Sequence, residues 1–263
     1  MEKIALLDTD FTVKTIMSQK DDGIHLMELF VSVSGFCLAC HEQTVAEIGN
    51  HDYNGSYKWI KEQIDDGKIK EYSDNEIIGI LEGLYGSSAC LMYRQLLKKS
   101  CDAQKPMFYQ EFYSSLDSFS YPTDKDAFLD KLKECDDNIG RGQGLGEKKL
   151  LVLLQVLQII DPKNVYVFCS DDGGARNSIF SVAKTPCITV ISLFYYLKGW
   201  GISKEEAEPY YIAYEKTLSS SQTTFKVFNI SGTVLEKLPC RQVFNMIYEN
   251  QCEALGTGSL KAL

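Results

Sequence analysis

The feature that most constrains the fold is a long apolar stretch at residues 147–160. Apolar side chains occupy almost every helical position there, so a helix must be buried on most sides and packed largely against a sheet. Its polar positions are predicted to form a thin stripe that faces outward: Lys148, Gln155 and Gln158. Gly144 and Gly146 mark its start, and Asp161-Pro162 ends it, because proline cannot continue a helix.

Short apolar runs that are typical of buried strands lie on both sides of this helix. They occur at residues 4–7, at 165–169 and within PCITVIS at 186–192. The sequence CLACH at 37–41 is interpreted as a further short strand, followed by a helix from near Glu42. Strands that alternate with helices in this order predict an α/β fold with a parallel sheet and right-handed crossovers.

Two parts of the chain depart from this alternation. Residues from about 50 to 140 are polar and tyrosine-rich with helical patterns, and they predict a helical insertion into a core that spans 1–210. Residues 211–263 predict a C-terminal extension, made of a β-hairpin that turns at Ser231-Gly232 and a helix. The last eight residues, GTGSLKAL, are expected to be a frayed tail.

The chain of 263 residues is acidic, with 27 lysines and arginines against 36 aspartates and glutamates and a net charge of −9. Phosphate binding depends on lysine and arginine, so this balance disfavours nucleic-acid binding over the whole surface. A nucleic-acid function therefore requires a local basic rim, or acids that bind cations. The sequence shows neither a bilayer-spanning apolar run nor a signal peptide, which predicts a cytoplasmic protein without a membrane partner.

The sequence CLACHE at 37–42 matches the local pattern of a covalent haem site, C-x-x-C-H. Haem attachment normally requires export, and no export signal is evident, so no haem is expected. A structural zinc at Cys37, Cys40 and His41 lacks a convincing fourth ligand. The nine cysteines are interpreted instead as free thiols that pack as small apolar residues in a reducing compartment.

Acidic residues stand where the predicted strands end. Asp8 follows the first strand, and Asp171 and Asp172 follow the strand after the long helix. In an open parallel sheet, ligands bind at the carboxyl edge, where the strand ends open into a crevice. Glu147 begins the long helix and Glu47 lies one or two turns into the helix after CLACH, so both are expected to reach this edge.

Unpaired carboxylates at one edge repel one another strongly unless a cation lies among them. Hard divalent ions suit such an all-oxygen site, so Mg²⁺ or Mn²⁺ is the predicted cofactor, and metal-assisted hydrolysis of a phosphate ester is the predicted chemistry. Each acid also has a purely structural interpretation. Asp8 then belongs to a turn or cap, Glu147 favours a helix N-terminus, and SDDGG is a tight turn.

In chain order, ALLDTDF, CHEQTVAEI, GLGEKKLLVLLQVL and CSDDGGARN resemble a PIN-domain nuclease, and the stretch from TPCITVIS to EEAEPY resembles the closing strand and helix of that family. The resemblance covers roughly residues 1–50 and 138–210. It implies an α/β/α PIN-like core and a Mg²⁺- or Mn²⁺-dependent endoribonuclease that acts on single-stranded or structured RNA. The implied metal-binding and catalytic carboxylates are Asp8, Glu47, Glu147, Asp171 and Asp172, and the choice between the last two is open.

The chain departs from the family pattern at Asp10, where the family usually has asparagine, and in the long stretch that precedes Glu147. Arg176 and Lys148 are the predicted substrate-binding residues, since a guanidinium matches phosphate bidentately. Lys149 and Lys184 are further candidates. The alternative for Arg176 is a salt bridge to one of the two aspartates of SDD.

Two other functions remain open. LLDTDFT also resembles the D-x-D-x-T start of haloacid-dehalogenase-like phosphatases, with Asp8 as the nucleophile and Asp10 as the general acid. That alternative leaves Glu47 and Glu147 without roles, and it needs a Ser/Thr-ended strand, for which LFVSVSG is a candidate. The second alternative is a non-catalytic PIN-like scaffold whose insertion or extension binds a protein partner or inhibitor.

Overall fold

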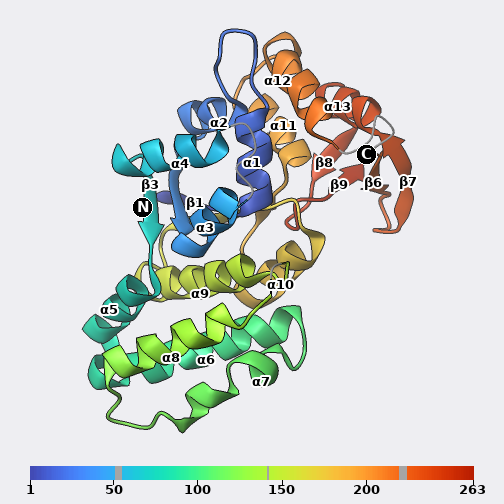
Figure 1. Ribbon diagram of the computed structural model, residues 1–263. Coiled ribbons are helices and arrows are strands. Elements are labelled where there is room, and N and C mark those ends of the chain that lie inside the picture. The colour runs from blue at the N-terminus through green and yellow to red at the C-terminus, as the bar shows by residue number, and fades with distance from the viewer. Residues whose placement is uncertain (51–54, 141, 219–223) are drawn as a thin grey trace.

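The centre of the molecule is a five-stranded parallel sheet with the strand order β3-β2-β1-β4-β5, and Figure 1 shows helices packed around it. The computed structural model describes residues 1–50, 55–140, 142–218 and 224–263. The strands are β1 Lys3–Leu7, β2 Cys37–His41, β3 Ile69–Tyr72, β4 Val165–Cys169 and β5 Cys187–Ile188. Ala5, Leu6 and Leu7 are fully buried, because β1 has a strand on each side and helices on each face. The predicted α/β fold with a parallel sheet is confirmed.

Helices cover both faces of the sheet and make an α/β/α core. Successive strand residues point to opposite faces, so Ala5 and Leu7 belong to one apolar cluster and Leu6 to the other. The first cluster includes α1, α2, α3, α4 and α11, and the second includes α9 and α10. Their bounds are α1 Thr9–Met17, α2 Leu26–Ser34, α3 Glu42–Asn50, α4 Ser56–Asp65, α9 Leu145–Ile160, α10 Gly173–Ala183 and α11 Val190–Gly199.

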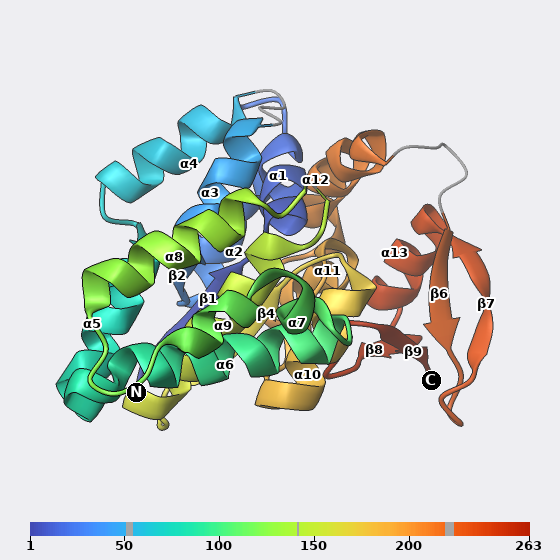
Figure 2. The same ribbon diagram turned by 60° about the horizontal axis from the view of Figure 1, so that its bottom comes forward.

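A further helical layer covers the side of α9 that faces away from the sheet (Figure 2). It consists of α5 Asp74–Tyr85, α6 Ala89–Gln104, α7 Phe108–Phe112 and α8 Lys125–Asp137. The predicted outward stripe on α9 is therefore wrong, since Lys148 is 3% exposed and Gln155 is 6% exposed. Gln155 donates to Ser100 Oγ of α6 at 2.9 Å. Gln155 therefore binds the added layer, while Lys148 donates to the carbonyls of Gln143 and Gly144 just before the helix.

The expected insertion at about 50–140 divides into two parts. Its first part contributes α4 and the edge strand β3, which pairs in parallel with β2. The helices of the added layer follow, together with two short 3-10 helices, Gly86–Ser88 and Ser114–Ser118. The strand β3 was not predicted, because it is short and carries two charged residues between Ile69 and Tyr72, as edge strands often do. Residues 51–54 and 141 lie outside the described part.

The C-terminal extension forms the expected hairpin and helix, and a second sheet with the order β7-β6-β9-β8. Its elements are β6 Thr224–Phe228, β7 Val234–Pro239, α13 Cys240–Tyr248, β8 Cys252–Ala254 and β9 Leu260–Ala262. The expectation of a frayed tail is wrong, because β9 lies between β6 and β8 (Figure 1). Leu260 is 2% exposed and anchors this last strand.

The extension shares an apolar core with the rest of the molecule. The expected boundary at residue 210 falls inside α12 Lys204–Thr217. Phe244 of α13 stacks on Tyr211 of α12, with ring centroids 4.3 Å apart, and meets Phe194 of α11 edge to face. Burial of these rings fixes the second sheet against α11 and α12.

The strand β5 ends earlier than PCITVIS predicts. Thr189 caps α11 by accepting the backbone N–H of Ser192, and this capping box turns the rest of the apolar run into helix.

Among the helices of the described residues, none has the length and apolar character needed to cross a bilayer.

Candidate functional site

Four of the five predicted carboxylates line one cavity of about 890 Å³ at the carboxyl edge of the parallel sheet. Asp8 follows β1, Glu47 lies on α3, Glu147 lies in the first turn of α9, and Asp172 caps α10. These segments are far apart in the chain, so the fold alone brings the four side chains together. Asp171 is not part of the described lining.

Asp8 is buried beside the end of the neighbouring strand. It is 4% exposed, and its Oδ2 accepts a hydrogen bond of 2.7 Å from Ser170 Oγ. Burial raises the pKa of Asp8 to about 7; hydrogen bonds from Ser170 and the Thr9 backbone oppose the rise, and nearby acidic charges, Glu47 foremost, add to it. Ser170 Oγ also accepts the backbone N–H of Asp172. One hydroxyl thus fixes Asp8 relative to Asp172.

The carboxylate of Glu47 is held by donors at both oxygens. Oε1 accepts the backbone N–H of Gly146 at 3.0 Å and the amide of Gln43 at 3.3 Å, and Oε2 accepts Thr9 Oγ1 at 2.9 Å. A Cβ at Gly146 would lie 2.7 Å from Glu47 Oε2, so the glycine makes this close approach possible. The start of α9 therefore positions the carboxylate of α3.

Glu147 experiences the charges of the other three acids. Burial raises the pKa of Glu147 to about 8, with the charges of Asp8 and Asp172 adding to the rise, Lys148 opposing it and Glu47 adding further. The four acids are therefore close enough to act on one another electrostatically. A cation among them would stabilise all four as carboxylates.

The two aspartates of SDD have different roles. Asp172 lines the cavity, and its Oδ1 accepts the backbone N–H of Ala175 at 2.7 Å, which caps α10. Asp171 accepts Lys14 Nζ at 2.9 Å and the backbone N–H of Val190 at 2.9 Å. Asp171 therefore joins α1 to the start of α11, and Asp172 is the candidate for the metal position.

Arg176 and Lys184 lie outside the described cavity lining. Arg176 Nε donates to the carbonyl of Thr257 at 2.9 Å, and Nη1 donates to the carbonyl of Ser170 at 3.2 Å. Arg176 thus ties the C-terminal segment to the end of β4, in place of the salt bridge considered as its alternative. Lys184 follows the last turn of α10, a helix of 11 residues that starts after Asp172. The length of that helix separates the two residues by about 16 Å.

The two lysines at the start of α9 differ in environment. Lys148 lines the cavity, but it donates to the carbonyls of Gln143 and Gly144 at 2.7 and 3.0 Å. Its ammonium also lies 4.1 Å from the centre of the Phe108 ring, and burial lowers its pKa. Lys149 is outside the described lining and lies in a buried ion network. Among the predicted basic residues, Lys148 alone belongs to the described lining.

Three residues that contact the site were not predicted from the sequence: Thr9, Ser170 and Lys105. Thr9 and Ser170 each stand beside a predicted acid at a strand end, and that adjacency is the signal that could have identified them as hydrogen-bonding supports. Lys105 follows α6 and reaches the cavity because the added helical layer packs over α9. No local pattern links it to Asp8.

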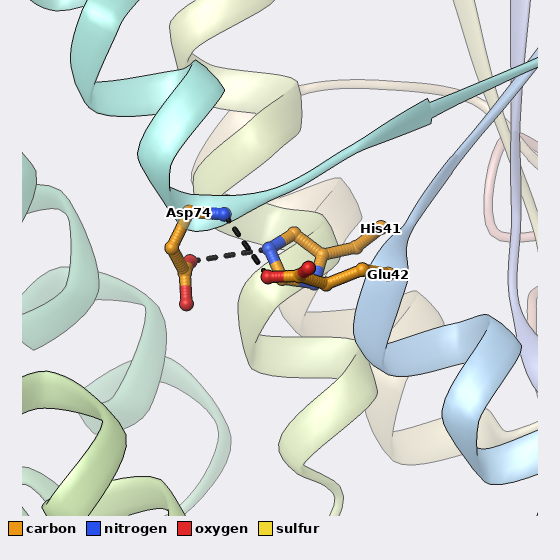
Figure 3. Close-up of side chains that lie close together, drawn as sticks. All are labelled: His41, Glu42 and Asp74. Atoms are coloured by element: carbon orange, nitrogen blue, oxygen red, sulfur yellow. Dashed lines mark hydrogen bonds and ion pairs between the residues drawn. The ribbon is translucent and has the colours of Figure 1, made fainter. Parts of the chain in front are cut away.

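A tighter group of possible metal ligands lies outside the cavity. Within the described residues, His41, Glu42 and Asp74 form the one group of three whose donor atoms all lie within 4.8 Å of one another (Figure 3). His41 Nδ1 accepts the backbone N–H of Gln43 at 3.1 Å, so Nε2 carries the proton and donates to Asp74 Oδ1 at 3.1 Å. Both ring nitrogens are occupied, which leaves no imidazole lone pair for a metal.

Asp74 belongs to a buried ion network that holds the added helical layer. Lys149, which is 1% exposed, donates to Asp74 and to Asp136 at 2.7 Å each, and Tyr93 also donates to Asp74. Burial opposes the charge on Lys149, but the two carboxylates raise its pKa. Burial alone would raise the pKa of Asp74, whereas Lys149 and His41 lower it below its usual value. The network joins α5, α6 and α8 to α9.

The cavity offers many oxygen ligands and few cations. The acids in its described lining are Asp8, Asp10, Glu47, Asp136, Asp137, Glu147 and Asp172, against Lys105 and Lys148. Oxygen donors of this kind fit a hard divalent cation such as Mg²⁺ or Mn²⁺. In the described structure, no three of these acids have carboxylate oxygens that all lie within 4.8 Å of one another, as the ligand atoms of the His41 group do. Binding of one cation by several of them therefore requires side-chain rotation.

Cys37 and Cys40 do not converge as ligands. Both lie on β2, where residues three apart point to opposite faces of the sheet. Cys37 is exposed, whereas Cys40 is buried in the first apolar cluster. All nine cysteines are free thiols, and eight of them are buried as predicted, whereas Cys37 is exposed.

Comparison of the chain with protein-family models, with curated proteins and with solved structures gave no match. The phosphatase alternative is weakened, because residues 29–34 of LFVSVSG belong to the helix α2 and do not form a Ser-ended strand.

We expect the metal-free protein to lose stability as the pH rises through the titration of Glu147. Its folded pKa of about 8 exceeds the ordinary 4.5, so protonation favours the folded state, and this contribution is lost as the pH rises through 8. Glu147→Gln should therefore be more stable than the wild type by about 1–3 kcal/mol at pH 8.5, with little difference at pH 4. Urea unfolding in EDTA measures the free energy of unfolding of both proteins at each pH. If that free energy had the same pH dependence in both proteins, this environment for Glu147 would be contradicted.

Proposed function

We propose that the protein is a Mg²⁺- or Mn²⁺-dependent nuclease with a PIN-like core that hydrolyses phosphodiester bonds in RNA. The observation that carries this proposal is the convergence of Asp8, Glu47, Glu147 and Asp172 on one cavity from four separate segments. Burial and mutual repulsion raise the pKa of Asp8 and of Glu147. Such crowding of like charges is unfavourable for folding and is typical of functional sites.

In this proposal Asp8, Glu147 and Asp172 hold the cation, and Glu47 completes the set from its fixed position against Gly146. The bound ion would supply an activated water and would stabilise the leaving oxygen of the phosphodiester. Ser170 orients Asp8 through its hydrogen bond of 2.7 Å. Lys148 contributes positive charge to the cavity for a substrate phosphate.

We expect the purified protein to cleave RNA with Mn²⁺ or Mg²⁺ and to stop on addition of EDTA. Asp172→Asn should lower the cleavage rate by at least about tenfold, because asparagine still caps α10 but carries no charge. Asp171→Asn should retain the rate within about threefold and lose about 1 kcal/mol of stability with its Lys14 ion pair. Gel assays of a labelled RNA and urea unfolding measure the two effects.

Asp102→Asn is the matched control, since Asp102 is an exposed acid on α6 outside the described lining. Equal cleavage by wild type and Asp172→Asn, or no cleavage with either metal, would refute the proposal. The phosphatase alternative predicts turnover of a small phosphate ester and a phosphorylated Asp8. The scaffold alternative predicts neither activity, but a stable protein partner on pull-down.

A further inference from the structure

Part of the cavity wall comes from the added helical layer and not from the α/β core. Gln104 is the last residue of α6 and Lys105 follows it, while Asp136 and Asp137 end α8. The cavity volume of about 890 Å³ lies near the upper end of the range of about 300–1,000 Å³ for small-ligand sites. It therefore accommodates a nucleotide-sized group beside a cation.

Gln104 has an unusual side-chain environment for a residue of this wall. Both its Nε2 and its Oε1 are shielded from solvent, and neither has a hydrogen-bond partner in the described structure. No other residue of the described cavity lining has an unpaired buried side-chain amide or hydroxyl. Buried polar groups are nearly always paired, because an unpaired one costs about 1–3 kcal/mol. Because solvent reaches neither atom in this position, a ligand that supplies a donor and an acceptor would recover this cost once the side chain rotates into the cavity.

Lys105, the next residue in the chain, provides a partly exposed positive charge. Its Nζ lies 3.5 Å from Gln143 Oε1 and 4.0 Å from a carboxylate oxygen of Glu111, and the side chain is 52% exposed. Contacts this long and exposed contribute little to stability, so the ammonium is available to an incoming anion. With the Gln104 side chain rotated into the cavity, Gln104 and Lys105 together present a donor, an acceptor and a cation.

We propose that Gln104 and Lys105 form a nucleotide subsite, in which the Gln104 amide pairs with a nucleobase edge and Lys105 binds a phosphate. The choice of a nucleotide as the ligand rests on the proposed nuclease function. Base edges present hydrogen-bond donors and acceptors, and a glutamine amide offers one group of each kind, as in its bidentate pairing with adenine. The subsite selects a sugar phosphate that bears a base over one that does not, and it gives cleavage a base preference.

The test is calorimetric binding of the four nucleoside 5′-monophosphates and of ribose 5-phosphate, which lacks a base, with Ca²⁺ present. At least one nucleotide should bind the wild type at least about tenfold more tightly than ribose 5-phosphate. Gln104→Met should lower the affinity for that nucleotide about tenfold or more, and should lower the affinity for ribose 5-phosphate less than about twofold. Lys105→Met should lower the affinities for the nucleotide and for ribose 5-phosphate to a similar degree, because it removes a phosphate contact that both ligands make.

Thermal unfolding of Gln104→Met separates recognition from a structural role. The Tm should stay unchanged or rise, since the substitution removes an unpaired buried amide; a fall in Tm would overturn the inference. Equal affinity of the wild type for nucleotides and ribose 5-phosphate would overturn it even if the protein cleaves RNA. If a nucleotide binds in a way that depends on Gln104 but the protein does not cleave RNA, the subsite would be supported and the proposed nuclease function would be refuted.

Discussion

Asp8→Asn is expected to abolish metal-dependent cleavage and, at the same time, to stabilise the metal-free protein. Asparagine is nearly isosteric and keeps an oxygen for the Ser170 hydrogen bond, but it carries no charge. Loss of one carboxylate from a divalent-ion site should lower Mn²⁺ affinity and the cleavage rate by at least about 100-fold. Stability should rise by about 1–3 kcal/mol at pH 8, because the wild-type carboxylate is buried near other acids and has a pKa of about 7.

The opposite signs of these two effects make the prediction specific. Mn²⁺ titration by calorimetry, RNA cleavage and urea unfolding in EDTA measure them on the same protein. Asp10→Asn is the matched control, since Asp10 lies at the same rim but is 65% exposed and pairs only weakly with Lys14. Its cleavage rate should stay within about threefold of wild type. Loss of both stability and activity in Asp8→Asn would identify Asp8 as structural, and retained Mn²⁺ binding would exclude it as a ligand.

Lys149→Met is expected to destabilise the fold by about 3–5 kcal/mol. Lys149 is buried between Asp74 and Asp136, and methionine would leave two carboxylates facing each other without a cation. Both carboxyl groups would then have raised pKa values in the folded protein. Their protonation favours folding, so the deficit should shrink as the pH falls towards 5.

A rescue experiment tests whether charge is the cause. The triple variant Asp74→Asn/Asp136→Asn/Lys149→Met should recover part of the lost stability in urea unfolding, because a neutral cluster has no uncompensated charge. Lys131→Met is the matched control, since Lys131 pairs with Glu134 on the surface of α8 and should contribute less than about 1 kcal/mol. A loss of stability below about 1 kcal/mol in Lys149→Met would show that the network is not a major support of the added layer.

The elements that could be predicted from sequence have a local cause. The strands β1 and β4 and the helix α9 match their apolar runs, because the period of apolar residues is a property of neighbouring positions. The strand β3 was missed because its apolar residues are too few, and β5 was extended too far because the capping box at Thr189 was not recognised. The terminal strand β9 forms by pairing with β6 and β8, which lie elsewhere in the chain.

Local pattern also dictates one part of the candidate site. One acid follows the first strand directly and two follow the later strand after a single serine, in an order that requires a parallel sheet; this places Asp8 and the SDD aspartates at the same edge. Tertiary packing alone decided that Asp172 lines the cavity while Asp171 binds Lys14. It also brought Lys105 to the rim, since that position depends on the added helices packing over α9. Contacts between segments distant in sequence set both outcomes, and no short-range periodicity encodes them.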